Sequence, residues 1–93
     1  MTNDNDIAVE TRRRRLLWRA SHRGIREMDI LVGGFARDRL ASMTAAELDE
    51  FEALIALPDN DLFDWLIRSV PVPERHLTAT MAALLAFRSS IET

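Results

Sequence analysis

The segment His22–Glu27 holds the densest group of polar side chains that could do chemistry in this chain. Its sequence places two guanidinium groups, an imidazole and a carboxylate around a single glycine within six residues. Arginine suits fixed, bidentate contacts with carboxylates or phosphates, and glycine permits a tight turn because it has no Cβ atom. These residue types favour recognition of a charged partner. They do not form the paired nucleophile and base of a self-contained catalyst.

Two interpretations of this turn are open. Gly24 could end one helix in a left-handed conformation, or it could be the N-cap of the next helix, with Glu27 placed favourably at the positive end of the helix dipole. Arg23, Arg26, Glu27 and Asp29 adjoin a helix whose apolar stripe other residues supply. Polar residues that the fold does not need, held at a rigid corner, predict a docking point.

Charge is segregated along the chain around this turn. Residues 1–10 carry three acids, residues 11–26 carry seven arginines and no acid, and residues 27–93 carry five arginines and twelve acids. The run Arg12–Arg15 could bind nucleic acid or an anionic membrane surface. The simpler interpretation is a solvated helix face that neutralises acidic helices nearby. The acidic balance of the remaining chain favours this second interpretation.

Length and composition predict one all-α domain. The chain has 93 residues, 47% of them apolar, with three glycines, three prolines and no cysteine. Without cysteine there is no disulfide framework or thiol catalyst. His22 and His76 have no second ligand at helical spacing, so no metal site is expected. No apolar run approaches the roughly 20 residues that span a bilayer, and a cytoplasmic protein without membrane insertion is expected.

Periodicity divides the chain into a disordered tail over residues 1–8 and a single domain over residues 9–91. The fold class is predicted to be a small, compact antiparallel bundle of five helices. Thr44 and Glu47 form a capping box for the third helix, and Pro58 stops that helix. The expected helix positions are 9–21, 26–41, from Ala45 to Pro58, from the Asp59–Asp61 caps onward, and 73–90 with Pro73 in the first turn.

Two further features carry alternatives. Gly33 and Gly34 interrupt the second helix and suggest either close approach of another helix or a kink. Trp18 and Trp65 are either core residues or half-exposed interface anchors. For Trp65 the core is the better interpretation.

The chain resembles the SdhE family, the succinate dehydrogenase flavinylation factors. Arg23, Gly24 and Glu27 match the family signature R-G-x-x-E. Residues 22–36, 47–52 and 58–66 resemble further family blocks in the expected order, and the resemblance extends over residues 12–88. One departure is that many relatives have glycine shortly after the Trp65-Leu66 pair, where this chain has Arg68 and Ser69. This departure concerns the link between the fourth and fifth helices and leaves the signature turn intact.

The resemblance implies a bacterial assembly factor rather than an enzyme. Such a factor binds the flavoprotein subunit of succinate dehydrogenase, and sometimes that of fumarate reductase, and promotes covalent attachment of FAD to a histidine of that subunit. FAD then belongs to the partner, and no cofactor, metal or nucleic acid is expected to bind stably to this chain. The predicted partner-binding residues are Arg19, His22, Arg23, Gly24, Arg26, Glu27 and Asp29. The alternative function is a small adaptor that binds nucleic acid or another protein through Arg12–Arg15.

Overall fold

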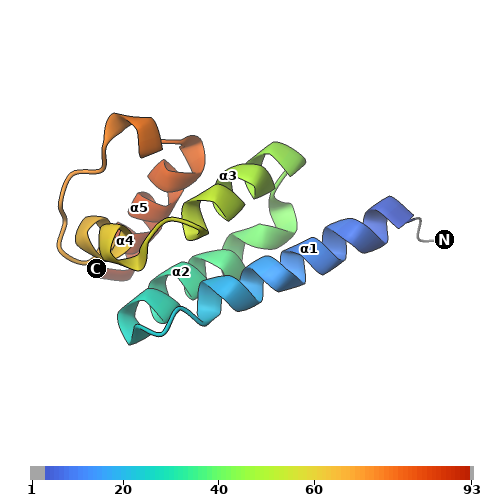
Figure 1. The fold of residues 1–93 in the computed structure, drawn as a ribbon, viewed down its shortest axis with the longest axis horizontal. Helices are drawn as coiled ribbons and strands as arrows, with labels where there is room; N and C mark the ends of the chain where they lie inside the picture. The colour runs from blue at the N-terminus through green and yellow to red at the C-terminus, as the bar shows by residue number, and fades with distance from the viewer. Residues whose placement is uncertain (1–3, 93) are drawn as a thin grey trace.

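The computed structural model describes residues 4–92, and these form an arrangement of five α-helices and two short 3-10 helices (Figure 1). The all-α bundle of five helices predicted from the sequence is confirmed. None of the helices in residues 4–92 combines the length and apolar character that crossing a bilayer requires. In chain order the elements are α1 (Asp4–Ser21), α2 (Arg26–Arg39), η1 (Leu40–Ser42), α3 (Ala45–Ile55), α4 (Asp59–Leu66), η2 (Glu74–His76) and α5 (Ala79–Glu92).

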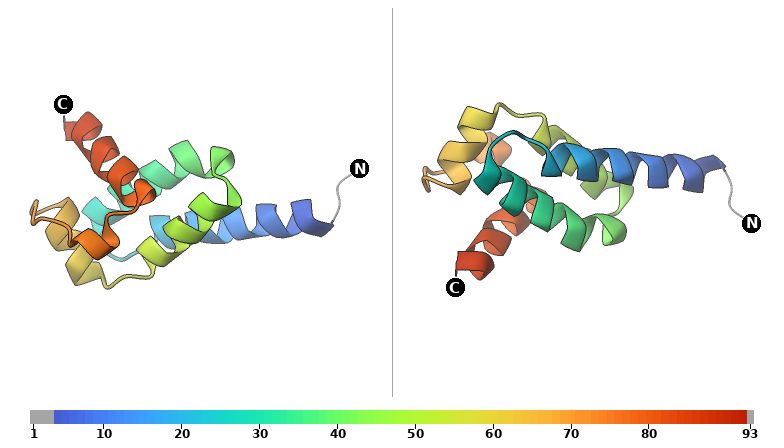
Figure 2. Two further views of the ribbon diagram at one scale, coloured as in Figure 1. Left: turned by 90° about the horizontal axis from the view of Figure 1, so that it is seen from above. Right: turned by 90° about the horizontal axis from the view of Figure 1, so that it is seen from below.

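Helices α1 and α2 form an antiparallel pair joined by the short turn between Ser21 and Arg26 (Figures 1 and 2). Helix α3 lies along this pair, and α5 packs on α2 and α3 at a steep angle to α2 (Figure 2). Helix α4 lies near the α1–α2 turn. The signature turn therefore sits at one end of the bundle, where α4 and the end of α5 also gather.

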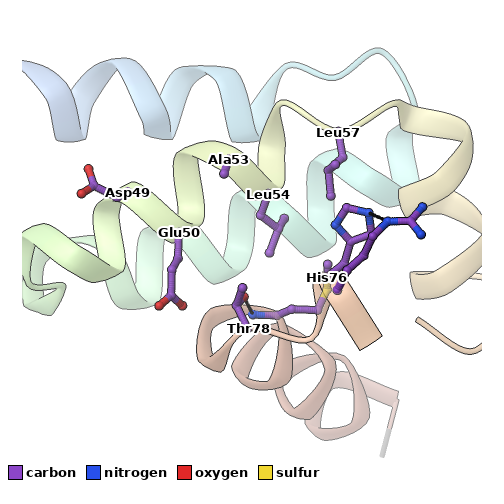
Figure 3. A pocket seen from close by; sticks show the side chains of 9 residues that line it. Asp49, Glu50, Ala53, Leu54, Leu57, His76 and Thr78 are labelled. Carbon is purple, nitrogen blue, oxygen red and sulfur yellow. Dashed lines mark hydrogen bonds between the residues drawn. The ribbon is translucent and has the colours of Figure 1, made fainter. Parts of the chain in front are cut away.

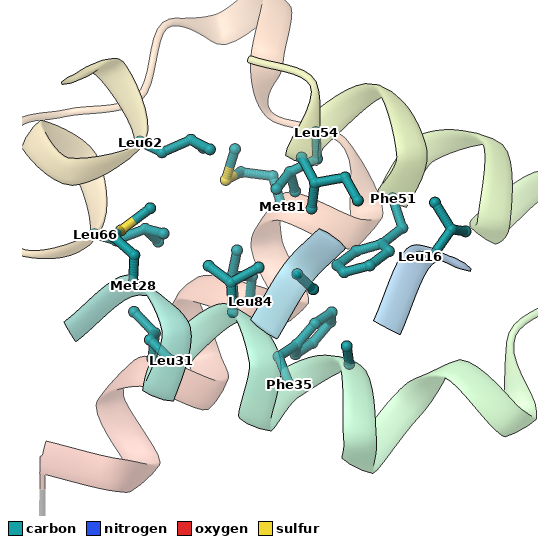
Figure 4. Packing of buried hydrophobic residues seen from close by; sticks show 14 of the residues in the cluster. Leu16, Met28, Leu31, Phe35, Phe51, Leu54, Leu62, Leu66, Met81 and Leu84 are labelled. Atoms are coloured by element: carbon teal, nitrogen blue, oxygen red, sulfur yellow. The ribbon is translucent and has the colours of Figure 1, made fainter. Parts of the chain in front are cut away.

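The core receives side chains from all five helices (Figure 4). Leu16, Phe35, Phe51, Leu62 and Leu84 come from α1 to α5 respectively, and each is at most 1% exposed. The rings of Phe35 and Phe51 lie 5.9 Å apart between centroids. Burying one such side chain contributes about 1.5–3 kcal/mol, so this shared core fixes the helices around the turn.

The two glycines of α2 lie where other helices approach closely. A Cβ atom on Gly33 would sit 2.9 Å from the Ser21 hydroxyl and 3.1 Å from the Ser21 Cα, and one on Gly34 would lie 3.6 Å from the Phe87 ring. The prediction of close helix approach is confirmed for Gly33. Because Ser21 is the last residue of α1, this contact holds the end of α1 against α2 right beside the turn.

The first helix begins earlier than expected. Helix α1 starts at Asp4 rather than near Val9, so residues 4–8, predicted to be part of a tail, are helical. The described side chains of this extension, from Asp6 to Glu10, are exposed. The helix therefore continues by local hydrogen bonding, beyond the part of α1 that packs in the core. Residues 1–3 of the predicted tail lie outside the described residues, and a domain boundary at residue 9 stays a prediction.

The start of α3 agrees with the prediction, although α3 ends at Ile55 before reaching Pro58, and the starts of α4 and α5 differ from it. The capping box of Thr44 and Glu47 is present. The N-cap of α4 is Pro58, so the expected caps Asp59 and Asp61 lie inside its first turn instead, where their charge complements the helix dipole.

The start of α5 also differs from the prediction. Pro73 was expected in its first turn, but that proline precedes η2 and α5 begins at Ala79. The Thr78 hydroxyl accepts a hydrogen bond from the Met81 N–H, and the Glu50 carboxylate accepts hydrogen bonds from the N–H and the hydroxyl of Thr80. These acceptors satisfy amide groups that an α-helix start leaves free, so they set the helix start after Thr78.

The link between α4 and α5 keeps a glycine-like backbone without a glycine. Ser69 has φ +58°, and it is the one non-glycine residue with positive φ in the part of the chain that the structure describes. Left-handed backbone costs an L-residue about 1–2 kcal/mol. The departure from the family sequence at Arg68-Ser69 therefore changes the strain of this link, while the conformation is one that glycine would adopt freely.

Candidate functional site

The turn between α1 and α2 places Gly24 at its outermost point. Gly24 has φ +88° and is exposed, and within residues 4–92 only its own atoms and those of its two chain neighbours lie within 4 Å of the position that a Cβ would occupy. Ile25 is the N-cap of α2, so Gly24 is not the cap that one interpretation of the sequence proposed. Glycine is required here by backbone conformation. The space around it is open to an approaching partner.

Arg23 points into the molecule and ties the turn to the α3–α4 junction. Its side chain is 8% exposed, and its guanidinium Nη2 lies 2.7 Å from Oδ1 of Asp59. Its Nε donates to the same oxygen at 2.9 Å, and Nη2 also lies 3.5 Å from the Leu57 carbonyl oxygen. A hydrogen-bonded, mostly buried guanidinium is a fixed structural link. Arg23 is thus committed to the fold.

Asp29 holds the other side of the turn. Its Oδ1 accepts a hydrogen bond from the backbone N–H of Arg23 at 2.6 Å. The prediction that the fold does not need Arg23 and Asp29 is wrong for both residues. They fix the conformation in which Gly24 and its neighbours are presented.

Arg26 and Glu27 form the exposed charged face of the turn. Both belong to the first turn of α2 and both are exposed. Neither side chain makes a hydrogen bond or ion pair with another group among the described residues. Glu27 lies in the first turn of α2 and complements the helix dipole, as the sequence predicted. Its carboxylate nevertheless remains free to accept hydrogen bonds from outside.

A shallow apolar hollow lies beside Glu27 and was not predicted from the sequence. It is lined by residues of α2, of the α4 end and of α5, namely Glu27, Ile30, Leu31, Leu66, Ile67, Arg88 and Ile91. All three isoleucines that line it are exposed, Ile30 at 55%, Ile67 at 38% and Ile91 at 50%. Clustered exposed aliphatic side chains mark interaction surfaces. The signal in the sequence was Ile30, which lies off the buried stripe of α2.

His22 and Arg19 extend the site along the end of α1. The His22 ring stacks on the indole of Trp18, with centroids 4.4 Å apart and planes 13° from parallel, and its Nδ1 lies 2.8 Å from the Trp18 carbonyl oxygen. Trp18 is 62% exposed, whereas Trp65 is 6% exposed. The core interpretation of Trp65 is confirmed. Arg19 is partly exposed and has no ion-pair partner within residues 4–92.

The first two arginines of the basic run, Arg12 and Arg13, bind other groups of the same chain. Arg12 bonds Asp49 at 2.7 Å and Glu52 at 3.0 Å, and these hydrogen bonds, Asp49 first, raise the pKa of the Arg12 guanidinium. Arg13 pairs with Glu10 at 3.0 Å and also donates to the carbonyl oxygens of Leu40 and Met43. The prediction that this run neutralises acidic helices nearby is confirmed for Arg12, whose partners lie on α3, whereas the acid that Arg13 pairs with belongs to α1 itself.

A second hollow lies between α3 and the link that leads into α5 (Figure 3). Leu54, Leu57 and Met81 give it an apolar floor. The polar groups at its rim are already engaged, because Glu50 binds Thr80 and the His76 ring accepts a hydrogen bond from Arg75. Within the described chain, no group of three or more His, Cys, Asp or Glu residues could hold a metal ion. Charged groups free to act therefore gather at the signature turn rather than here.

Comparison with known proteins identifies the family of this chain. A protein family described as "Flavinator of succinate dehydrogenase" matches residues 14–88, which include all seven predicted partner-binding residues. This chain belongs to that family. The resemblance seen in the sequence is confirmed.

Named members of the family share substantial identity with this chain. It is 45% identical over 77 residues to FAD assembly factor SdhE of Acetobacter pasteurianus, which covers 83% of this chain and 71% of that protein. It is 42% identical over 71 residues to mitochondrial succinate dehydrogenase assembly factor 2 of Candida glabrata and 33% identical over 79 residues to that of Dictyostelium discoideum. The matches cover 73% and 84% of this chain. The chain spans about half the length of these two mitochondrial relatives, 46% and 56% respectively.

Proposed function

We propose that this chain binds the flavoprotein subunit of succinate dehydrogenase and promotes covalent attachment of FAD to it. Membership of the flavinator family supports the role, and its relatives are named FAD assembly factor and succinate dehydrogenase assembly factor. The observation that carries the proposal is the outward presentation of Gly24 and Glu27 at the end of the bundle. From the resemblance we also expect the chain to act on the flavoprotein subunit of fumarate reductase.

The turn residues divide into two roles in this proposal. Gly24 allows the partner's backbone or side chains to approach closely, while Arg26 and Glu27 make charge-assisted hydrogen bonds to it. Arg19 and His22 extend the contact along α1. Arg23 and Asp29 act indirectly, since their internal bonds hold the turn in its docking conformation. The hollow beside Glu27 receives an apolar side chain of the same subunit.

Positioning is sufficient for this activity. The reactive chemistry of flavinylation belongs to the flavin and to the acceptor residue of the partner, so the chain needs no nucleophile of its own. A rigid surface that holds the subunit in a reactive arrangement lowers the entropic part of the activation barrier. We expect the FAD to be held by the flavoprotein. The chain then acts as an assembly factor.

Co-expression tests the proposal directly. The flavoprotein subunit is expressed with and without this chain under conditions of incomplete labelling, and flavin fluorescence of the subunit is measured after denaturing electrophoresis. We expect fluorescence to rise when the chain is present. Equal labelling with and without it would refute the proposal.

The alternative of nucleic-acid binding through Arg12–Arg15 is disfavoured by the internal ion pairs. Arg12 and Arg13 are bound to acids and carbonyl groups of the same chain, whereas Arg14 and Arg15 have no ion-pair partner among residues 4–92. Binding through neutralised phosphates has a steep salt dependence. The alternative predicts that binding to DNA or RNA weakens steeply as the salt concentration rises. Binding that does not change with salt concentration would exclude the alternative.

A further inference from the structure

The arginines near the turn fall into two groups by their partners. Arg12, Arg13 and Arg23 are paired within the molecule. Arg14 and Arg37 are exposed and make no ion pair in the part of the chain that the structure describes. Holding unpaired charges close together costs electrostatic energy, so a group of unpaired cations on one face points to an anionic partner.

Arg14 and Arg37 line the same shallow groove between α1 and α2. Its other lining residues are Leu17, Trp18, Ser21 and His22, and we call it the α1–α2 groove. The two helices run side by side here (Figure 2). Another hollow, distinct from the two described above, adjoins the groove. It shares Ser21 and Arg37 with the groove and continues to Gly24 and Arg26. The groove thus leads directly to the signature turn.

The charge of this surface is strongly positive. Arg14, Arg26 and Arg37 provide three cations across the two adjoining hollows, and the one acid lining them is Asp29. That carboxylate already accepts the N–H of Arg23. The exposed face of Trp18, opposite the stacked His22 ring, adds an apolar contact area in the same groove.

We propose that the α1–α2 groove is a second docking surface, which binds an acidic segment of the flavoprotein subunit through Arg14, Arg37 and the exposed Trp18, all of which line it. This proposal rests on the proposed function and adds the chemistry of the partner segment. The segment carries carboxylates for the two guanidinium groups and an apolar side chain for the indole. Arginine forks match carboxylates in a bidentate geometry.

An acidic protein segment fits this groove better than nucleic acid does. One face of the Trp18 indole is already covered by His22, which halves the stacking platform that bases use in single-stranded binding. The rest of the chain is acidic, with twelve acids and five arginines over residues 27–93. A short segment can avoid these acids, whereas a long polyphosphate would meet them.

The test compares single charge reversals at two arginines of the groove, Arg14 on α1 and Arg37 on α2, with a control reversal at Arg15 on α1. Binding of the purified flavoprotein subunit is measured for the wild-type chain, Arg14→Glu, Arg37→Glu and the control Arg15→Glu. Arg15 is also exposed and unpaired within residues 4–92, but it does not line the groove. We expect Arg14→Glu and Arg37→Glu to weaken binding roughly tenfold each at low salt, and Arg15→Glu to weaken it much less. High salt should shrink this difference, because it screens exposed charges.

The outcomes separate this proposal from the proposed function. If the wild-type chain binds the subunit and Arg14→Glu binds no worse than Arg15→Glu, the groove proposal is wrong and the proposed function stands. If the wild-type chain does not bind the subunit at all, both fall. A separate experiment measures binding of the wild-type chain and Arg14→Glu to a single-stranded DNA 20-mer. Binding of this DNA that Arg14→Glu abolishes, with subunit binding unchanged, would overturn the acidic segment as the occupant.

Discussion

The ion pair of Arg23 with Asp59 gives the sharpest prediction about how the turn is held. It joins the α1–α2 turn to the first residue of α4, across a sequence separation of 36 residues. Arg23 is 8% exposed at its side chain and Asp59 is 40% exposed. We therefore expect this pair to stabilise the turn and the bundle together.

The magnitude follows from the contacts. Two guanidinium nitrogens reach one carboxylate oxygen at 2.7 and 2.9 Å, which counts as one charge-assisted interaction of about 1.5–3 kcal/mol. The bond to Leu57 is 3.5 Å long and adds little. Arg23→Ala also removes two buried methylene groups of about 0.8 kcal/mol each. The expected total loss for Arg23→Ala is about 3–4.5 kcal/mol, or roughly 12–36 °C in Tm for a domain of this size.

A double-mutant cycle isolates the pair. Unfolding in urea, followed by circular dichroism, is measured for the wild type, Arg23→Ala, Asp59→Ala and the double variant. We expect a coupling of about 2 kcal/mol, because removal of Asp59 leaves a buried guanidinium unpaired. A coupling below about 0.5 kcal/mol would refute this reasoning. The control is the exposed pair of Arg12 and Asp49, which has the same 2.7 Å length; its coupling should be clearly smaller.

The same variants distinguish positioning from direct contact. If Arg23 acts by holding the turn, Asp59→Asn should reduce flavinylation in parallel with Arg23→Ala. Loss of labelling in Arg23→Ala, with full labelling by a folded Asp59→Asn, would show that Arg23 contacts the partner itself.

Three further predictions concern the hollow beside the turn, the α4–α5 link and the capping box. Ile30→Asp should lower flavinylation with little change in the urea midpoint, whereas Ile7→Asp, at the almost equal exposure of 54% against 55%, should leave flavinylation unchanged; equal effects would contradict the docking role of the hollow. Ser69→Gly should stabilise the chain by up to about 1 kcal/mol, because glycine relieves the positive φ at some entropic cost; an unchanged urea midpoint would argue against strain there. Hydrogen bonds from the capping box lower the pKa of Glu47 below its ordinary 4.5. The contribution of ionised Glu47 to the free energy of unfolding is therefore complete above pH 4.5 and is lost as the pH falls through the lowered pKa of the folded state. Glu47→Gln should make the free energy of unfolding fall less steeply as the pH is lowered through this range. A pH dependence identical to that of the wild type would contradict this contribution.

Much of the fold could be predicted from local signals. Apolar stripes of period 3.6 located the helices, and the residues around Thr44 set the start of α3 because a capping box is a local interaction. The start of α5 was placed wrongly, although one local signal marks it: the Thr78 hydroxyl accepts a hydrogen bond from the Met81 N–H three residues on. Its other determinant has no local signature, because Glu50 lies 30 residues away in sequence and meets Thr80 only in the folded bundle.

The candidate site was predictable in part for the same reason. Gly24 and Glu27 stand out in the sequence as a glycine and a carboxylate at a helix junction, and the structure places both on the surface. The inward course of Arg23 depends on Asp59, a partner distant in sequence. The apolar hollow depends on Ile67 and Ile91 from other elements coming next to Ile30. Neither arrangement has a local signature.

The most direct measurement of the central claim is the rate of covalent flavinylation of a purified apo-flavoprotein subunit supplied with FAD and this chain. The variants are Glu27→Gln, Gly24→Arg and the control Glu74→Gln, which alters an exposed glutamate far from the turn in sequence. We expect the wild type and Glu74→Gln to accelerate labelling equally, and Glu27→Gln and Gly24→Arg to lose the acceleration while keeping helical circular dichroism. Full acceleration by folded Glu27→Gln and Gly24→Arg would contradict the claim that the turn docks the partner.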